Sequence, residues 1–115
     1  MSKIKGIAMR VDEQPKVEEI ENTLKGYQDF VGGNLIQALK ISNDVVMVIN
    51  GEGKLLGLQP NFLCDTIHDV IVGNAIFVGC TEWGEWTSIT KEQANKVLDY
   101  IEYSTIRFIR GGICR

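Results

Sequence analysis

The segment from Val45 to Gly79 decides the fold of this chain. It contains the runs Val45-Val46-Met47-Val48-Ile49, Asn50-Gly51-Glu52-Gly53, Lys54-Leu55-Leu56-Gly57-Leu58 and Asp69-Val70-Ile71-Val72-Gly73-Asn74-Ala75-Ile76-Phe77-Val78-Gly79. A strand that is apolar throughout is typical of one covered on both faces. A short Asn/Gly-rich piece between two apolar runs is typical of a hairpin turn. The sequence therefore predicts a central hairpin with arms at Val45–Ile49 and Lys54–Leu58.

The second half of this segment carries two interruptions. Pro60 has no backbone N–H to give to a strand ladder, so we expect pairing to stop there and residues 61–68 to form an irregular loop. Apolar pieces follow at 69–73 and 75–80, and we expect Gly73-Asn74 to bend or bulge one strand rather than separate two. Residues 86–89 then predict a final hairpin arm.

The first forty residues predict three more strands. In residues 3–11 the alternation places Ile7, Met9 and Val11 on one buried face. A turn at 12–15 leads to a short return strand at 16–20, with Val17 and Ile20 directed inward. Residues 34–41 predict the next strand.

Two helices are predicted from caps and periodicity. Asn22 or Thr23 caps the first, and Gly32-Gly33 ends it. The second begins at a capping box formed by Thr90 and Gln93 and extends over about 91–104. Residues 105–110 either continue this helix or are extended. The apolar stripes are Leu24, Tyr27, Phe30 and Val31 in the first helix and Ala94, Val97, Leu98 and Ile101 in the second.

Length and composition indicate one domain over residues 1–115. The chain is 44% hydrophobic and 23% charged, and its net charge is −3. We expect a single α+β domain, a mostly antiparallel sheet of five to seven strands with two helices packed on it. The acidic balance predicts no DNA partner, and no apolar run is long enough for a membrane span. A cytoplasmic protein is expected.

Catalytic and metal-binding motifs are weak. The glycines around Lys54 do not fit a phosphate loop, because Val48 holds the place of the first glycine and Leu55 follows the lysine. Asp65, His68 and Asp69 have the chemistry of a divalent-metal site, but a polar loop is the preferred interpretation. Three cysteines without a C-x-x-C pair indicate reduced thiols. We expect no enzyme activity, no cofactor and no metal.

Six residues form the predicted ligand site. Trp83 and Trp86 lie in a predicted loop, where they either stack on a planar ligand or partner, or fold back onto the sheet as core. Asparagine amides at strand breaks can reach base edges, and arginines can grip phosphate in bidentate fashion. A nucleotide-like ligand needs such groups together. The other four residues are Asn61, Asn74, Arg107 and Arg110.

A resemblance to a family adds to this interpretation. Its motifs are Asn22-Thr23-Leu24 with Val31-Gly32-Gly33, then Gly53-Lys54-Leu55-x-Gly57-x-x-x-Asn61, and Asp69-x-Ile71-x-Gly73-x-Ala75-x-x-x-Gly79. Over residues 4–100 the chain resembles the phage and Gram-positive bacterial domain of unknown function DUF3846. That family often has an arginine after the Asn61 position, where this chain has Phe62. Residues 105–115 look like an extension.

The resemblance implies a mobile-element accessory protein acting in the host cytoplasm. Such proteins counter host defence either by sequestering a nucleotide signal or by blocking a protein. We therefore expect a binder of a small nucleotide-like ligand, with a protein-binding inhibitor that uses the Trp83–Trp86 loop as the alternative. The apolar and basic tail at 106–113 also predicts a homo-oligomer.

Overall fold

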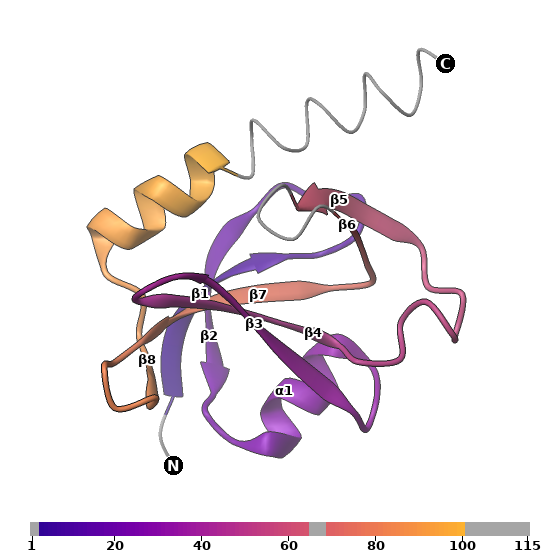
Figure 1. Cartoon of the computed structure of the whole chain (residues 1–115), viewed down its shortest axis with the longest axis horizontal. Helices are drawn as coiled ribbons and strands as arrows, with labels where there is room; N and C mark the ends of the chain where they lie inside the picture. The colour runs from indigo at the N-terminus through magenta and orange to yellow at the C-terminus, as the bar shows by residue number, and fades with distance from the viewer. Residues whose placement is uncertain (1–2, 65–68, 101–115) are drawn as a thin grey trace.

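The structure is a computed structural model that describes residues 3–64 and 69–100, and it confirms the predicted α+β fold (Figure 1). A six-stranded antiparallel sheet and a two-stranded sheet carry two helices. The elements are β1 (Lys3–Met9), β2 (Lys16–Glu21), α1 (Leu24–Val31), β3 (Ile36–Ser42), β4 (Val45–Asn50), β5 (Pro60–Cys64), β6 (Asp69–Val72), β7 (Ala75–Cys80), β8 (Trp86–Thr87) and a helix over residues 91–100.

The large sheet has the strand order β2-β1-β7-β4-β3, and β8 pairs with the end of β7. β7 is its centre, since Phe77 lies opposite Ile7 of β1 on one side and Met47 of β4 on the other. β5 and β6 pair with each other in the small sheet. The strands adjacent in sequence, β1–β2 and β3–β4, form the two outer hairpins.

Successive side chains of β4 and β7 feed two cores on opposite faces of the sheet. On one face Met47 and Phe77 pack with Phe62 and Ile71 of the small sheet and with the helix over residues 91–100. On the other face Val46, Val48, Ile76 and Val78 pack with Tyr27 of α1. Because adjacent strand residues point to opposite faces, strands covered on both sides must be apolar throughout. This confirms the expectation for residues 45–48, whereas Ile49 is only partly buried.

The predicted helix ends are confirmed where the structure describes them. The Thr23 hydroxyl accepts a hydrogen bond from the Gly26 N–H at 3.0 Å, and Gly32 closes α1 with φ of +76°. At the second helix Thr90 and Gln93 exchange hydrogen bonds of 2.9 and 3.1 Å, which is the predicted capping box. The end of this helix, with Ile101, lies outside the described residues.

The predicted central hairpin is wrong. Residues 51–57 form a compact loop instead of a return strand, with the Leu56 N–H donating to the Glu52 carbonyl at 2.9 Å and Gly57 at φ of +68°. Local bonds of this kind satisfy the backbone without a partner strand. The partners of β4 are β3 and β7.

The segment from residue 60 to residue 74 also differs from the prediction in two ways. Residues 60–64 form β5 rather than an irregular loop, and Pro60 is tolerated as its first residue. Gly73-Asn74 separates β6 from β7, which belong to different sheets, rather than bending one strand. Gly73 has φ of +76°, a conformation that glycine adopts without strain.

Three apolar residues predicted inside lie further out. Val11 is half-buried in the turn after β1. Val17 is 52% exposed because β2 is an edge strand, whereas Ile20 is buried as predicted. Leu24 is 61% exposed, since a side chain in the first helical position leans toward the N-terminal end of the helix. No helix within residues 3–64 and 69–100 is long and apolar enough to cross a membrane.

Candidate functional site

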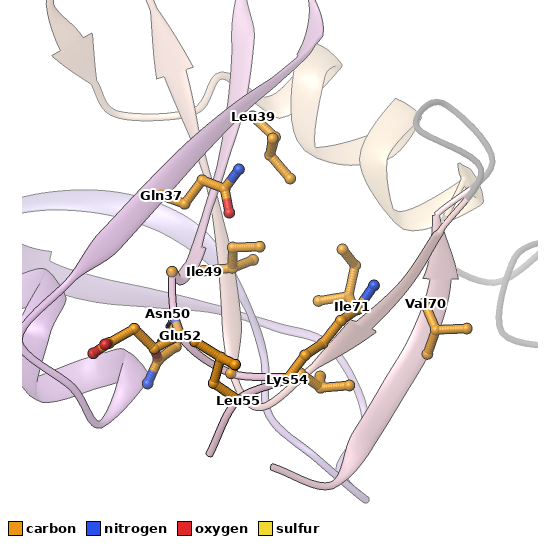
Figure 2. Close-up of a pocket in the computed structure, with 12 residues that line it drawn as sticks. Gln37, Leu39, Ile49, Asn50, Glu52, Lys54, Leu55, Val70 and Ile71 are labelled. Carbon is orange, nitrogen blue, oxygen red and sulfur yellow. Dashed lines mark hydrogen bonds between the residues drawn. The ribbon is translucent and has the colours of Figure 1, made fainter. Parts of the chain in front are cut away.

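A cavity of about 280 Å³ opens between β3 and β4 of the large sheet and β6 of the small sheet. Figure 2 shows Gln37 and Leu39 of β3 on one side and Val70 and Ile71 of β6 on the other. Ile49 of β4 forms its floor between them. The loop of residues 51–55 closes one end. We call this cavity the β3–β6 cleft.

The cleft exists because the small sheet covers only part of the large one. Ile71 is buried in the core on this face, but Leu39 on the edge strand β3 and Ile49 on the neighbouring β4 are only partly buried. A strip of apolar surface is therefore left beside β6. A molecule that enters the cleft would cover these side chains further.

Asn50 holds the loop that closes the cleft. Its side chain is buried, with Oδ1 accepting from the Glu52 N–H at 2.8 Å and Nδ2 donating to the Val31 carbonyl at 3.3 Å. It thereby joins the loop to the end of α1. Gly53 is buried against β6, and a Cβ there would lie 2.8 Å from Cγ2 of Val72. The close approach explains the glycine and fixes the loop on β6.

The side chains of the cleft suit an amphipathic molecule. The floor and walls are apolar, and the polar side chains among the lining residues, apart from the buried Asn50, are Gln37, Glu52 and Lys54. The Glu52 carboxylate is directed away from Ile49 and Ile71 (Figure 2). An apolar cavity with a few polar groups at its edge is the usual form of a small-molecule site. Within residues 3–64 and 69–100, no group of three or more His, Cys, Asp or Glu side chains could hold a metal ion.

A second cavity, of about 410 Å³, lies between the end of β3 and the helix over residues 91–100. Its lining includes Asp44, which accepts hydrogen bonds from the Gln93 amide at 2.8 Å and the Ser42 hydroxyl at 2.9 Å. These two bonds lower the pKa of the Asp44 carboxyl. Because both carboxylate oxygens already bind protein donors, Asp44 fixes the helix to the β3–β4 turn.

The two predicted tryptophans have different surroundings. Trp83 is 81% exposed in the turn between β7 and β8. Trp86 of β8 is partly buried, with its ring edge-on to Tyr27 at a centroid distance of 4.9 Å. Trp86 therefore packs onto the sheet, as one of the two predicted alternatives had it, whereas Trp83 is exposed to solvent.

The two predicted asparagines bind the backbone rather than pointing freely into a cleft. Asn61 Nδ2 donates to the carbonyls of Met9 and Gly73, both at 2.8 Å. Asn74 Oδ1 accepts from the Val11 N–H at 3.1 Å, and its Nδ2 donates to the Phe30 carbonyl at 3.3 Å. Both amides thus hold together the end of β1 and the joint between β6 and β7.

β7 separates the asparagines from the tryptophans. Asn74 precedes this strand, whereas Trp86 pairs with Cys80 at its other end. Six strand residues span about 20 Å, so these four side chains do not share one site. Arg107 and Arg110 lie outside the described residues, as do Asp65 and His68 of the metal-like loop.

Sequence reasoning missed the residues of the β3–β6 cleft. Gln37 and Leu39 lie in a segment correctly predicted as a strand, and Ile49 in a strand predicted to be buried on both faces. The only local signal is the polar Gln37 in an apolar strand. The cleft depends on how far the small sheet extends over β4, which no short pattern encodes.

The comparison with protein families covers nearly the whole described fold. The model of the domain of unknown function DUF3846 matches residues 4–102. The chain belongs to this family. The match includes both described helices, every described strand except the first residue of β1, and all residues of the β3–β6 cleft. The cleft is therefore part of the DUF3846 domain itself. No curated protein and no solved structure matches the chain.

Proposed function

We propose that this DUF3846 protein is a non-enzymatic binder of a small nucleotide-like ligand, and that the ligand enters the β3–β6 cleft. The observation that carries the proposal is the strip of partly buried apolar side chains between β3 and β6, bordered by the side chains of Gln37 and Lys54. A planar base would cover the apolar strip. The polar side chains at the border would contact the edges of the base and the charged groups of the ligand.

The size of the cleft limits the ligand. Its volume of about 280 Å³ lies just below the range of roughly 300–1,000 Å³ that is usual for ligand sites. A base with its sugar is therefore the part that would be enclosed. The Gln37 amide can donate to and accept from a base edge. Lys54 in the closing loop would then lie nearest to a phosphate.

The biological context of such a binder follows from the sequence resemblance. We infer that it belongs to a phage or another mobile element and acts in the host cytoplasm, which is the setting that the sequence resemblance implies. There it would sequester a nucleotide-derived defence signal. Sequestration requires affinity and no chemical step, which agrees with a cleft whose polar groups lie at the edge of an apolar strip.

Thermal denaturation with free nucleotides tests the proposal. A ligand that binds only the folded state stabilises it by about 2.7 kcal/mol at a hundred times its Kd. We expect at least one member of a panel of linear, cyclic and ADP-ribose-type nucleotides to raise the Tm. Gln37→Phe places a larger side chain in the cleft from β3, so it should weaken the binding of that nucleotide at least tenfold.

Glu19→Phe is the matched control, because Glu19 is exposed on β2, at the opposite edge of the same sheet. It should bind the ligand as the wild type does. A panel without any stabilising member would overturn the proposal, as would a Gln37→Phe variant that is folded and binds with unchanged affinity.

A protein-binding inhibitor is the second candidate, and the exposure of Trp83 favours it. A tryptophan that is 81% exposed leaves a large apolar ring in water, and such rings are frequent binding hot spots. On this reading, a host or phage protein would shift the fluorescence of Trp83 on mixing, and Trp83→Ala would abolish the complex. A nucleotide-induced rise in Tm that survives Trp83→Ala would favour the cleft instead.

A further inference from the structure

The large sheet ends in two very different edge strands. At one edge β2 carries the charged residues Lys16, Glu18, Glu19 and Glu21 and follows Pro15. Charges and a neighbouring proline are common protections against pairing with another chain. At the other edge β3 has the sequence Ile-Gln-Ala-Leu-Lys-Ile-Ser, with a single charge at Lys40. In the part of the chain that the structure describes, β3 pairs on one side only.

The register of β3 against β4 shows which backbone groups face outward. The Gly51 N–H donates to the Leu35 carbonyl at 2.8 Å, and this pair extends the register in which Ile36 lies opposite Asn50. In an antiparallel ladder, hydrogen-bonded and non-hydrogen-bonded pairs alternate. Residues 37 and 39 therefore bond to β4, as residue 35 does. The N–H and C=O groups of residues 36, 38 and 40 point away from it.

We propose that β3 pairs with β3 of a second copy of this chain, antiparallel, across a two-fold axis at Ala38. In this register Ile36 of each copy lies opposite Lys40 of the other, and Ala38 lies opposite itself. All three outward-facing residues find partners. The two Lys40 side chains are kept apart, whereas a register centred on Lys40 would place like charges opposite each other. The irregularity between Lys40 and Ser42 limits the length of the pairing, and the two-fold axis places one such irregularity at each end.

Small and exposed side chains allow this approach. Ala38 is exposed in the single chain and has no side-chain atom beyond Cβ, so the two backbones can meet at the axis without a clash. An interface of two strands is small, and small interfaces give weak or transient association. The result is a reversible dimer built on a continuous sheet of twice the width.

This pairing would also complete the β3–β6 cleft. Gln37 and Leu39 lie on the cleft side of β3, and in the proposed register Leu39 of one copy lies opposite Gln37 of the other. Directly opposed side chains are about 4.5–5.5 Å apart at Cβ. Each cleft would thus gain an amide and a leucine from the second copy. The dimer itself does not depend on the ligand proposed above, so the two proposals can fail separately.

Sedimentation equilibrium of the full chain, without added nucleotide, tests the dimer. The wild type should shift from 12.8 kDa toward twice that mass between low micromolar and several hundred micromolar concentration. Ala38→Pro removes one outward N–H, and proline is tolerated on the free side of an edge strand. This variant should stay monomeric over the same range, with a melting temperature close to that of the wild type.

A charge-swap pair tests the register and does not depend on the proline variant. Ala38→Lys and Ala38→Glu each place like charges at the axis, so each alone should associate at least tenfold more weakly than the wild type. An equimolar mixture should restore association, because the charges are then opposite. A wild type that is monomeric throughout would overturn the proposal. So would a mixture that associates no better than either variant alone, or an Ala38→Pro variant that dimerises like the wild type.

Discussion

The ring of Trp86 meets the ring of Tyr27 edge to face, with the ring planes at 90°. Asn22 reinforces this contact from both sides. Its Oδ1 accepts from the Tyr27 hydroxyl at 2.8 Å, and its Nδ2 donates to the Trp86 carbonyl at 3.1 Å. These three residues join the start of α1 to β8 at the end of the sheet, and they close one of the two cores. The contact therefore stabilises the layer that α1 forms on the sheet.

Trp86→Ala should lower the free energy of unfolding by about 2–4 kcal/mol, because it removes a large packed ring and its aromatic contact. Trp83→Ala should change it by no more than about 0.5 kcal/mol, since the Trp83 ring lies in solvent. Urea unfolding followed by circular dichroism measures both. Equal losses in the two variants would show that the turn between β7 and β8 packs differently.

Tyr27 should make the protein sensitive to alkaline pH. Burial raises the pKa of its phenol from 10.0 to about 12. As the pH rises above 10, the unfolded chain loses this proton while the folded chain keeps it, so the free energy of unfolding falls until about pH 12. Tyr27→Phe should be less stable at neutral pH by about 1 kcal/mol, through loss of the hydrogen bond to Asn22.

The pH dependence is measured by urea unfolding at several alkaline pH values. The difference in stability between the wild type and Tyr27→Phe should shrink as the pH rises from 10 toward 12, because only the wild type carries this ionisation. A difference that stays constant over this range would contradict the burial of the phenol as the cause.

Asn61→Ala should destabilise the joint between the two sheets by about 1–3 kcal/mol, since it leaves the Met9 and Gly73 carbonyls without this donor. Urea unfolding measures the loss. Asn34→Ala is a suitable control, because its side chain is exposed before β3. A ligand-binding role without a structural one would instead leave the stability of Asn61→Ala unchanged.

Features encoded by neighbouring residues could be predicted from the sequence. The Thr90–Gln93 capping box, the Thr23 cap and the stop at Gly32 each depend on residues within four positions of one another. The double covering of residues 45–48 could also be predicted, because a buried strand must be apolar on both faces. These signals were enough for the fold class.

Features that depend on distant residues could not be predicted. Asn61 bonds to Met9, 52 positions away, and nothing in the sequence around Asn61 distinguishes such an amide from one that faces a ligand. Residues 54–58 contain three leucines and look like a strand, yet Gly57 at positive φ and bonds within the loop favour a turn. This loop closes one end of the β3–β6 cleft, and the cleft itself depends on how far the small sheet extends over β4, so it could not be predicted either.

Lys54→Ala should weaken the binding of nucleotides that carry phosphate about two- to fivefold, which is the effect expected for an exposed charge pair. It should leave the corresponding nucleoside unaffected, because Lys54 lies in the loop at the end of the cleft while the base would cover Leu39 and Ile49. Isothermal titration of each pair of ligands measures the effect, which added salt should reduce. Lys91→Ala, in an exposed position of the second helix, should change neither affinity. Equal weakening of nucleotide and nucleoside would show that Lys54 shapes the cleft rather than contacting phosphate.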